Sequence, residues 1–169
     1  MADNADFWIE NLQLQPHPEG GYFREVYRSR ETISADLLMV RYNSERSFAT
    51  SIYFLLKSDQ ISTFHRLKSD EIWHFYSGSP ITVYIIDKDG RLSENICGRD
   101  VRNNEQLQLV IPHGCWFAAK VNLPDSYSLV GCNVAPGFDF SDFELAEKSA
   151  LMECFPQHQE LIEKMCICK

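Results

Sequence analysis

Short apolar and β-branched segments recur along most of the chain, and turn residues separate them. Gly, Pro, Asp and Ser gather between nearly all of these segments, as in Ser77-Gly78-Ser79-Pro80. Short strands spaced about ten residues apart are typical of an antiparallel sandwich or barrel. The pattern predicts strands over residues 21–27, 48–56, 61–67, 71–76, 81–87, 105–111, 116–121 and 127–134.

The two ends of the chain follow a helical pattern instead. Residues 4–13 place Phe7, Ile9 and Leu12 among polar neighbours, after Asn4 or Asp6 as the cap. From Phe143 onward apolar residues again recur at helical spacing, and a second helix is expected after Pro156. We therefore predict a single all-β domain over residues 1–169, with a barrel at about 20–140, a short N-terminal helix and a helical tail at about 142–166.

Composition narrows the choice of partners. The net charge is -8 and the 16 basic residues are scattered, which disfavours nucleic acid as a ligand. No apolar run approaches the ~18 residues that cross a bilayer, and the N-terminus lacks a signal-peptide core. The six cysteines form no Cys-x-x-Cys pair, which disfavours a zinc ribbon. We expect a cytoplasmic protein with reduced thiols, a small-molecule ligand and no membrane partner.

Residues 63–78 hold the candidate chemistry. Alternate side chains of a strand share a face, so Thr63, His65 and Leu67 are expected to point together. The same rule groups Glu71, Trp73 and Phe75 on the next strand. If both sets face the interior, His65 and Glu71 share a cavity whose walls are Leu67, Trp73, Phe75 and Phe117.

Two kinds of chemistry suit His65 and Glu71. Apolar walls raise the pKa of a carboxyl group and lower that of a histidine, so that the pair can remove a proton next to a carbonyl group without a metal. As metal ligands, the two residues leave an ordinary divalent site short by one or two. The alternative without chemistry is that the pair is hydrogen-bonded inside a filled barrel.

A second cluster lies at residues 19–28. Gly20 and Gly21 allow a tight turn, Arg24 or Arg28 could bind an anion, and Glu19 could supply a second acid–base group. The alternation places Tyr22, Arg24 and Arg28 on one face and Phe23, Glu25 and Tyr27 on the other, without deciding which face points inward. An exposed or dimer-edge strand with solvated arginines is the alternative.

A third cluster spans residues 137–144. Ser141 or Asp142 is expected to cap the following helix, with Glu144 in its first turn. Asp139 is the residue of this cluster expected to contact a ligand. The full predicted substrate-binding set is Glu19, Tyr22, Phe23, Arg24, Leu67, Lys68, Trp73, Phe75, Phe117 and Asp139.

Three segments carry a resemblance to a known family. Residues 16–25 (PHPEGGYFRE), 64–74 (FHRLKSDEIWH) and 134–145 (VAPGFDFSDFEL) resemble the signatures of the DUF985 (Cupin_5) branch of the cupin superfamily, and the similarity runs from about residue 7 to 155. The resemblance implies a double-stranded β-helix, or jelly-roll barrel, that is usually paired into a homodimer. The family is often labelled a predicted sugar epimerase, a label that itself rests on resemblance.

The chain departs from the general cupin pattern at the metal ligands. In the frame His-x-His-x3-Glu-x6-Gly, His65, Glu71 and Gly78 are present, but the second histidine is Leu67. In the frame Pro-x-Gly-x2-His, the histidine is replaced by Phe117. No cofactor is therefore expected; a divalent metal is disfavoured, and its ligands would be His65 and Glu71.

The leading hypothesis is a small-molecule-binding cupin that epimerises or isomerises a sugar or sugar nucleotide without a metal. In it His65 is the base, Glu71 its proton partner and Arg24 the anion anchor. The alternatives are a non-catalytic ligand-binding or sensing cupin, and a metal-dependent enzyme with a reduced ligand set.

Overall fold

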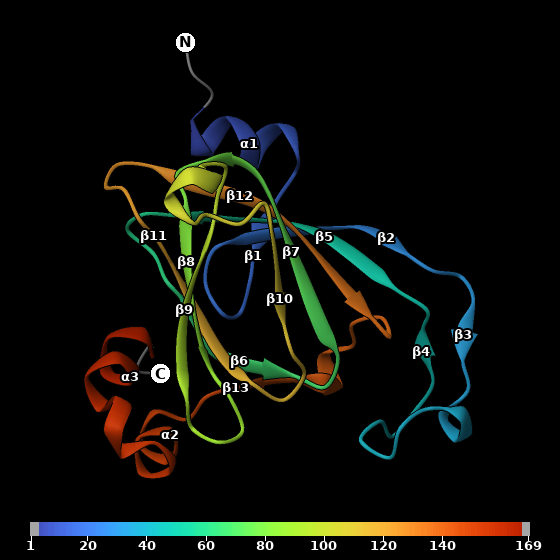
Figure 1. The fold of residues 1–169 in the computed structure, drawn as a ribbon. Coiled ribbons are helices and arrows are strands. Elements are labelled where there is room, and N and C mark those ends of the chain that lie inside the picture. The colour runs from blue at the N-terminus through green and yellow to red at the C-terminus, as the bar shows by residue number, and fades with distance from the viewer. Residues whose placement is uncertain (1–3, 167–169) are drawn as a thin grey trace.

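Two antiparallel sheets packed face to face form most of the molecule. In the computed structural model, which describes residues 4–166, the larger sheet has the strand order β1-β2-β5-β12-β7-β10 and the smaller one β13-β6-β11-β8-β9 (Figure 1). This arrangement confirms the predicted all-β jelly-roll fold. The strands of the larger sheet are β1 Gln15–Pro16, β2 Tyr22–Arg28, β5 Thr50–Lys57, β7 Asp70–Gly78, β10 Gln108–Ile111 and β12 Tyr127–Ala135. Those of the smaller sheet are β6 Ser62–Leu67, β8 Ile81–Ile86, β9 Leu92–Cys97, β11 Trp116–Val121 and β13 Phe143–Leu145.

Five strands lie where none was predicted: the two-residue strands β1, β3 Thr32–Ile33 and β4 Arg46–Ser47, and the longer β9 and β13. The sequence of β9, LSENIC, is half polar and has no clear alternation, but it pairs with β8 along its whole length. The segment β13 was predicted as the start of the helical tail. It pairs instead with β6, Phe143 opposite Leu67 and Leu145 opposite His65, so the sheet satisfies its backbone groups.

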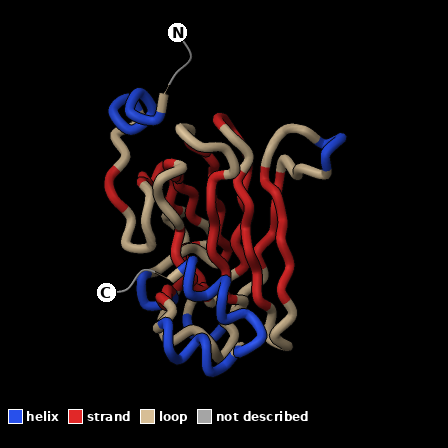
Figure 2. Tube along the Cα trace, turned by 90° about the vertical axis from the view of Figure 1, so that its left-hand side faces the viewer, coloured by secondary structure: helices blue, strands red, loops and turns tan. Residues whose placement is uncertain are grey.

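The helices lie on the outer faces of the sheets. Figure 2 shows the two C-terminal helices together on one side of the strands, with α1 apart from them. Helix α1 covers the larger sheet at a small cluster around Leu14, Leu55 and Leu129, and the C-terminal pair buries Phe64 and Ile86 of the smaller sheet. The helices are α1 Ala5–Asn11, α2 Lys148–Cys154 and α3 Gln159–Met165, with 3-10 turns at Ala35–Leu37, Val101–Asn103, Phe140–Asp142 and Pro156–His158.

The caps of the tail differ from the predicted ones. The carboxylate of Asp139 accepts a hydrogen bond from the Ser141 backbone N–H and caps the 3-10 turn Phe140–Asp142. Glu147 caps α2 by accepting from the backbone N–H groups of Ser149 and Ala150. Neither Ser141 nor Asp142 caps a helix, because three strand residues intervene before α2 begins.

Asp142 forms a buried ion pair with Arg46. Both oxygens of Asp142 accept from the guanidinium, at 2.6 Å from Nε and 2.6 Å from Nη2. Arg46 lies in β4 Arg46–Ser47, which pairs with β3 Thr32–Ile33 in an arm that projects from the barrel (Figure 1). The ion pair therefore ties the base of the arm to the segment that leads into β13.

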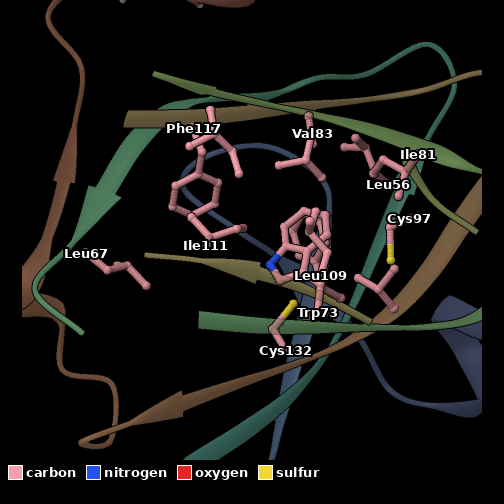
Figure 3. Close-up of a cluster of buried hydrophobic side chains, with 14 of the residues drawn as sticks. Leu56, Leu67, Trp73, Ile81, Val83, Cys97, Leu109, Ile111, Phe117 and Cys132 are labelled. Carbon is pink, nitrogen blue, oxygen red and sulfur yellow. The ribbon is translucent and has the colours of Figure 1, made fainter. Parts of the chain in front are cut away.

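An apolar cluster fills one end of the space between the sheets. Figure 3 shows Leu56, Ile81, Val83 and Leu109 packed with the large rings of Trp73 and Phe117. At the other end, where β5 begins and β12 ends, the residues that point inward include buried polar groups such as Glu71 and His65. No helix within residues 4–166 has the length and apolar character that a membrane crossing requires.

We expect Asp142→Ala to destabilise the protein by about 3–5 kcal/mol, because it leaves the Arg46 guanidinium buried without its counter-charge. Urea unfolding followed by tryptophan fluorescence measures the loss. The matched control is Glu144→Ala, which breaks the exposed Arg66–Glu144 pair and should cost about 0–1 kcal/mol. Equal losses in the two variants would show that the buried pair has no special role.

The predicted homodimer stays a prediction, and the arm is the place to test it. Leu37, Met39 and Val40 are 78%, 65% and 103% exposed there, and exposed apolar side chains that lie together often mark a protein–protein contact. We expect light scattering after size exclusion to give about twice 19.6 kDa. Leu37→Asp with Met39→Asp should shift the mass to that of a monomer, whereas Leu123→Asp, also exposed, should leave it unchanged.

Candidate functional site

A cavity of about 180 Å³ lies between the sheets at the end that the apolar cluster leaves open. Its floor is made by neighbouring strands of the larger sheet, and β6 and β13 of the smaller sheet face it. The segment before β2 and the loop after β12 close its sides. The lining residues are His17, Glu19, Phe23, Glu25, Arg28, Thr50, Ile52, Phe54, His65, Leu67, Glu71, Trp73, Cys132, Val134, Phe138, Asp139, Phe140 and Phe143.

The strand registers explain which side chains form the floor. Cys132 of β12 lies opposite Ile52 of β5 and Trp73 of β7, and Val134 lies opposite Thr50 and Glu71. All six of these residues line the cavity. Because alternate residues of a strand share a face, the register places Glu71 and Trp73 inside, as predicted from their spacing.

An irregularity in β2 decides which of its residues point inward. Phe23 and Glu25 lie opposite Phe54 and Ile52, and the register then shifts, so that Arg28 lies opposite Thr50. The extra residue is a β-bulge at Val26, and it returns Arg28 to the inner face. The predicted sharing of one face by Arg24 and Arg28 is therefore wrong.

Tyr22 and Arg24 do not line the cavity. Tyr22 packs under α1 on the outer face of the larger sheet. The Nη1 group of Arg24 donates to Gln13 Oε1 at 3.2 Å in an exposed contact. Their placement in the substrate-binding set is corrected, and Arg28 is the arginine that reaches the cavity.

A second irregularity lies in β6. Phe117 of β11 pairs with His65, but Ala119 pairs with Ser62, so β6 holds one extra residue between them. Ser62 and His65 consequently both reach the cavity side, while the Thr63 hydroxyl donates to the backbone oxygen of Met165 in α3. Thr63 does not share a face with His65 and Leu67, contrary to the simple alternation.

The turn before β2 brings Glu19 against His65. Gly20 has φ +110°, and a Cβ there would collide with the carbonyl oxygen of Ile61, so only glycine allows this approach. The carbonyl oxygen of Glu19 accepts from the Thr63 N–H at 2.9 Å, and its Oε1 accepts from the Ser62 hydroxyl at 2.8 Å. The PHPEGG segment thereby delivers a carboxylate into the barrel.

His65 is paired with Glu19. Its Nε2 lies 3.1 Å from Glu19 Oε2, and both side chains are almost fully buried. Its Nδ1 lies 2.8 Å from the carbonyl oxygen of Thr63. Within residues 4–166 no hydrogen bond or ion pair joins His65 to Glu71, so the predicted proton partner of His65 is replaced by Glu19.

The pair holds one dissociable proton. A neutral imidazole has a single N–H, yet both ring nitrogens of His65 face oxygen acceptors. A carbonyl oxygen cannot donate, so Nδ1 must carry a proton toward Thr63. A second proton between Nε2 and Glu19 satisfies the other contact, either on the imidazole or on the carboxyl group. The pair is thus able to release and accept one proton.

Burial and charge act in opposite directions on this pair. Burial lowers the pKa of His65, and the negative charge of Glu19 only partly offsets it. Burial would raise the pKa of Glu19, but His65, the hydrogen bond with His17 and the Ser62 hydroxyl outweigh it and leave the pKa below its usual range. The proton is therefore weakly held, which suits a group that works as a base near neutral pH.

Glu71 lies in a different environment from Glu19. Burial, together with the charge of Glu19, raises the pKa of Glu71 to about 8. The indole N–H of Trp73 and the thiol of Cys132 act in the opposite direction without cancelling this rise. Glu71 is therefore mostly a neutral carboxylic acid at pH 7, with a proton to donate.

Aromatic rings hold His65 and His17 in place. The His65 ring lies 3.9 Å from that of Phe117 and 5.3 Å from that of Phe143, measured between centroids. The His17 ring packs edge-on against Phe23 at 4.6 Å, and its Nδ1 lies 3.3 Å from Glu19 Oε2. These rings exclude water from one side of the Glu19–His65 pair.

Of the other predicted substrate-binding residues, Phe23, Leu67, Trp73 and Asp139 line the cavity together with Glu19. Phe117 lies behind His65, in contact with its ring. Two residues lie elsewhere. Phe75 packs against the apolar cluster, and Lys68 points into a neighbouring groove, where its Nζ lies 3.3 Å from Asp142 Oδ1.

Sequence reasoning gave no role to His17 and did not place Glu25. The spacing His17-x-Glu19 before paired glycines was nevertheless a usable signal. Two residues of one tight turn separated by a single position can contact each other, and here His17 and His65 both approach Glu19 Oε2. The inward position of Glu25 depends on the register of β2 and β5 and carries no local signal.

The donor set does not fit a cupin metal. The positions of two expected histidines hold Leu67 and Phe117, which have no donor atom, and His65 Nε2 is engaged by Glu19. In the part of the chain that the structure describes, no group of three or more His, Cys, Asp or Glu side chains is placed to hold a metal ion.

Comparison with known proteins identifies the family of this chain. Residues 6–146 match the family described as Cupin superfamily (DUF985). Uncharacterized protein YML079W of Saccharomyces cerevisiae is 35% identical over 144 residues, which cover 79% of this chain and 71% of the yeast protein.

Solved structures agree with this match. Protein SO0799 from Shewanella oneidensis has a TM-score of 0.89 and 39% identity over 99% of both chains. A hypothetical protein from Leishmania major has a TM-score of 0.87 and 37% identity, covering 98% of this chain and 100% of its own. Oxalate decarboxylase from Bacillus subtilis shares the fold alone, with a TM-score of 0.54 and 18% identity over 89% of this chain and 36% of its own. The family match over residues 6–146 and these full-length structural relatives show that the chain belongs to the DUF985 family of the cupin superfamily.

Proposed function

We propose that the cavity binds a small polyhydroxylated carbonyl compound and moves a proton at the carbon next to its carbonyl group, as a sugar epimerase or isomerase does. One observation carries the proposal: a pair with a weakly held proton, Glu19–His65, and a neutral carboxylic acid, Glu71, line the same cavity. Groups whose environments push their pKa values apart are what general acid–base catalysis requires.

The Glu19–His65 pair acts as the base. In its deprotonated form it takes the proton from the carbon, and Thr63 and Ser62 hold the pair in position through their hydrogen bonds. A base held by fixed partners reacts without first reorganising. His17, at 3.3 Å from the same carboxylate oxygen, adds a third contact that keeps Glu19 from turning away.

Glu71 acts as the acid. Its proton passes to the carbonyl oxygen of the substrate while the carbon loses its own, so that a neutral enediol forms and charge does not build up in the apolar cavity. The reverse transfers return a proton to carbon and restore Glu71. Return to the opposite face inverts that carbon, and return to the neighbouring carbon isomerises the compound.

The charges of the cavity favour a neutral, hydroxylated ligand. Four of the lining residues carry carboxyl groups, Glu19, Glu25, Glu71 and Asp139, and one lining residue, Arg28, carries a guanidinium. Arg28 is already engaged, with Nη2 at 2.7 Å and Nε at 3.0 Å from the two oxygens of Glu25. Hydroxyl groups, which donate to carboxylates, are the complementary ligand chemistry.

The acid–base proposal predicts solvent exchange. In D₂O, the native protein should introduce deuterium next to the carbonyl of an accepted hydroxy-ketone or hydroxy-aldehyde sugar, read by proton NMR over a panel of such sugars. His65→Asn and Glu71→Gln should each slow this exchange by about 10²–10⁴-fold, the usual contribution of one acid–base group.

Matched controls lie on the same strand and on a nearby one. His74→Asn changes a histidine of β7 that faces outward and pairs with Gln108, and Glu144→Gln changes an exposed carboxylate of β13. Both should exchange at the native rate. A sugar that raises the melting temperature yet is recovered without deuterium would identify a non-catalytic binding protein instead.

The protonation of Glu71 can be tested through stability alone. The folded chain keeps a proton on Glu71 up to about pH 8, whereas an unfolded glutamate loses it at about pH 4.3. The free energy of unfolding therefore falls as pH rises between these values. Glu71→Gln removes this loss. As pH rises from 5 to 8, the free energy of unfolding of the variant should therefore increase relative to that of the native protein by up to about 1.4 kcal/mol per pH unit.

Urea unfolding of both proteins at each pH unit from 5 to 9 measures the difference. Glu144→Gln replaces an exposed carboxylate, and its free energy of unfolding should differ from that of the native protein by the same amount at every pH. If the difference for Glu71→Gln were also the same at every pH, Glu71 would be ionised at neutral pH and its role as the acid would fail.

A further inference from the structure

A second hollow, of about 310 Å³, lies beside the cavity. It is walled by the loop after β6, the turn between β10 and β11, the loop after β8 and the segment that leads into β13. Four cationic side chains from three segments of the chain line this groove: Arg41, Arg66 and Lys68 at the end of β6, and Lys88. The protein carries a net charge of -8, so this groove is a positively charged region on a negatively charged molecule.

The two carboxylates of this groove leave part of that charge uncompensated. Asp142 is bound by both Nε and Nη2 of the buried Arg46, and it lies 3.3 Å from Lys68 Nζ. Glu144 is paired with Arg66 at 2.8 Å. Two cations, Arg46 and Lys68, therefore meet the two oxygens of Asp142, and only one is needed to neutralise it.

Two of the four cations, Lys88 and Arg41, have N–H groups that can still donate to a ligand. Lys88 is exposed, and its side chain lies beside Gly114. Within the described residues, no hydrogen bond or ion pair engages its Nζ. Arg41 uses Nε on the carbonyl oxygen of Lys68 at 2.7 Å, and its guanidinium lies over the Tyr42 ring, 4.9 Å from the centroid. The backbone contact and the ring fix this guanidinium while leaving its two terminal nitrogens for a ligand.

The groove and the cavity share a wall. Leu67 and Phe143 line both, so a ligand whose polar body occupies the cavity could extend past these side chains into the groove. The cavity itself suits no anion, because its arginine is taken by Glu25 and its other charges are carboxyl groups. Of the two hollows, it is therefore the groove whose positive charge would attract an anionic part of the ligand.

We propose that the groove of Arg41, Arg66, Lys68 and Lys88 binds the phosphate group of a phosphorylated hydroxy-carbonyl ligand whose organic part enters the cavity. A phosphate dianion needs several converging N–H donors, and planar guanidinium groups and flexible ammonium groups both supply them. The inference rests on the proposed function only for the placement of the organic part; the phosphate contacts are independent of catalysis.

Fructose 6-phosphate, fructose and inorganic phosphate serve as probes at low ionic strength, with binding measured by ³¹P NMR titration and by thermal shift. We expect fructose 6-phosphate to bind more tightly than fructose or inorganic phosphate, since it alone fills both hollows. Its affinity should fall with added salt, because the contacts of the groove are exposed.

Lys88→Gln should weaken fructose 6-phosphate at least about tenfold, as expected for loss of one charge-assisted contact, and Lys88→Arg should restore most of the affinity. Lys120→Gln removes the same charge from an exposed lysine of β11 that lines neither hollow, and it should bind within twofold of the native protein. Equal weakening by Lys88→Gln and Lys120→Gln, or no phosphate-dependent binding at all, would overturn the inference.

Two further outcomes separate this inference from the acid–base proposal. Glu71→Gln should keep the native ratio of affinity for fructose 6-phosphate over fructose, because this ratio reports the phosphate contacts and Glu71 does not line the groove. Phosphate-dependent binding without deuterium exchange would therefore support the groove while removing catalysis. Equal affinity for inorganic phosphate and fructose 6-phosphate would overturn the spanning ligand.

Discussion

The contact between Glu19 and His65 sets the chemistry of this barrel. It brings a carboxylate from the turn before β2 onto an imidazole in β6, where both side chains are almost fully buried, and the rings of Phe117 and Phe143 pack against the imidazole. A buried carboxylate and a buried imidazole are each costly alone, and together they are stabilised only while they share a proton or a charge. The consequence reaches Glu71, because the charge of Glu19 adds to burial in keeping a proton on that carboxyl group.

The contact depends on backbone features as much as on the two side chains. Gly20 passes so close to Ile61 that no other residue fits, and the extra residue in β6 turns Ser62 and His65 toward the same carboxylate. A β-bulge is the usual way to re-aim a side chain within a sheet. In both β2 and β6 the irregularity lies beside residues that line the cavity.

The sequence was sufficient for the fold class and for half of the candidate site. Alternation and turn residues predicted the main strands, and the spacing of Glu71 and Trp73 placed both inside, because β7 is regular there. Arg28 and Thr63 were placed on the wrong faces because period-two alternation fails across a bulge, and a single sequence carries no marker for the extra residue. Arg24 lies before the bulge and was misassigned because alternation alone does not say which face of β2 points inward. The partner of His65 was missed for another reason: Glu19 is far from it along the chain, and only the pairing of the turn with β6 brings them together.

Carbon side chains at two ligand positions alter the task of the polar groups that remain. Phe117 lies against the ring of His65, where a histidine would present a second donor to a cation, so His65 meets an apolar face instead and its pKa falls. Leu67 lines both the cavity and the cationic groove, and its side chain offers neither of them a donor atom. With one hollow dominated by carboxyl groups and its neighbour by lysine and arginine, the two can recognise different parts of one ligand. A hydroxylated carbonyl compound in the first hollow would be held near its acid and base by an anion bound in the second, which is a way of using binding energy remote from the reacting carbon to position it.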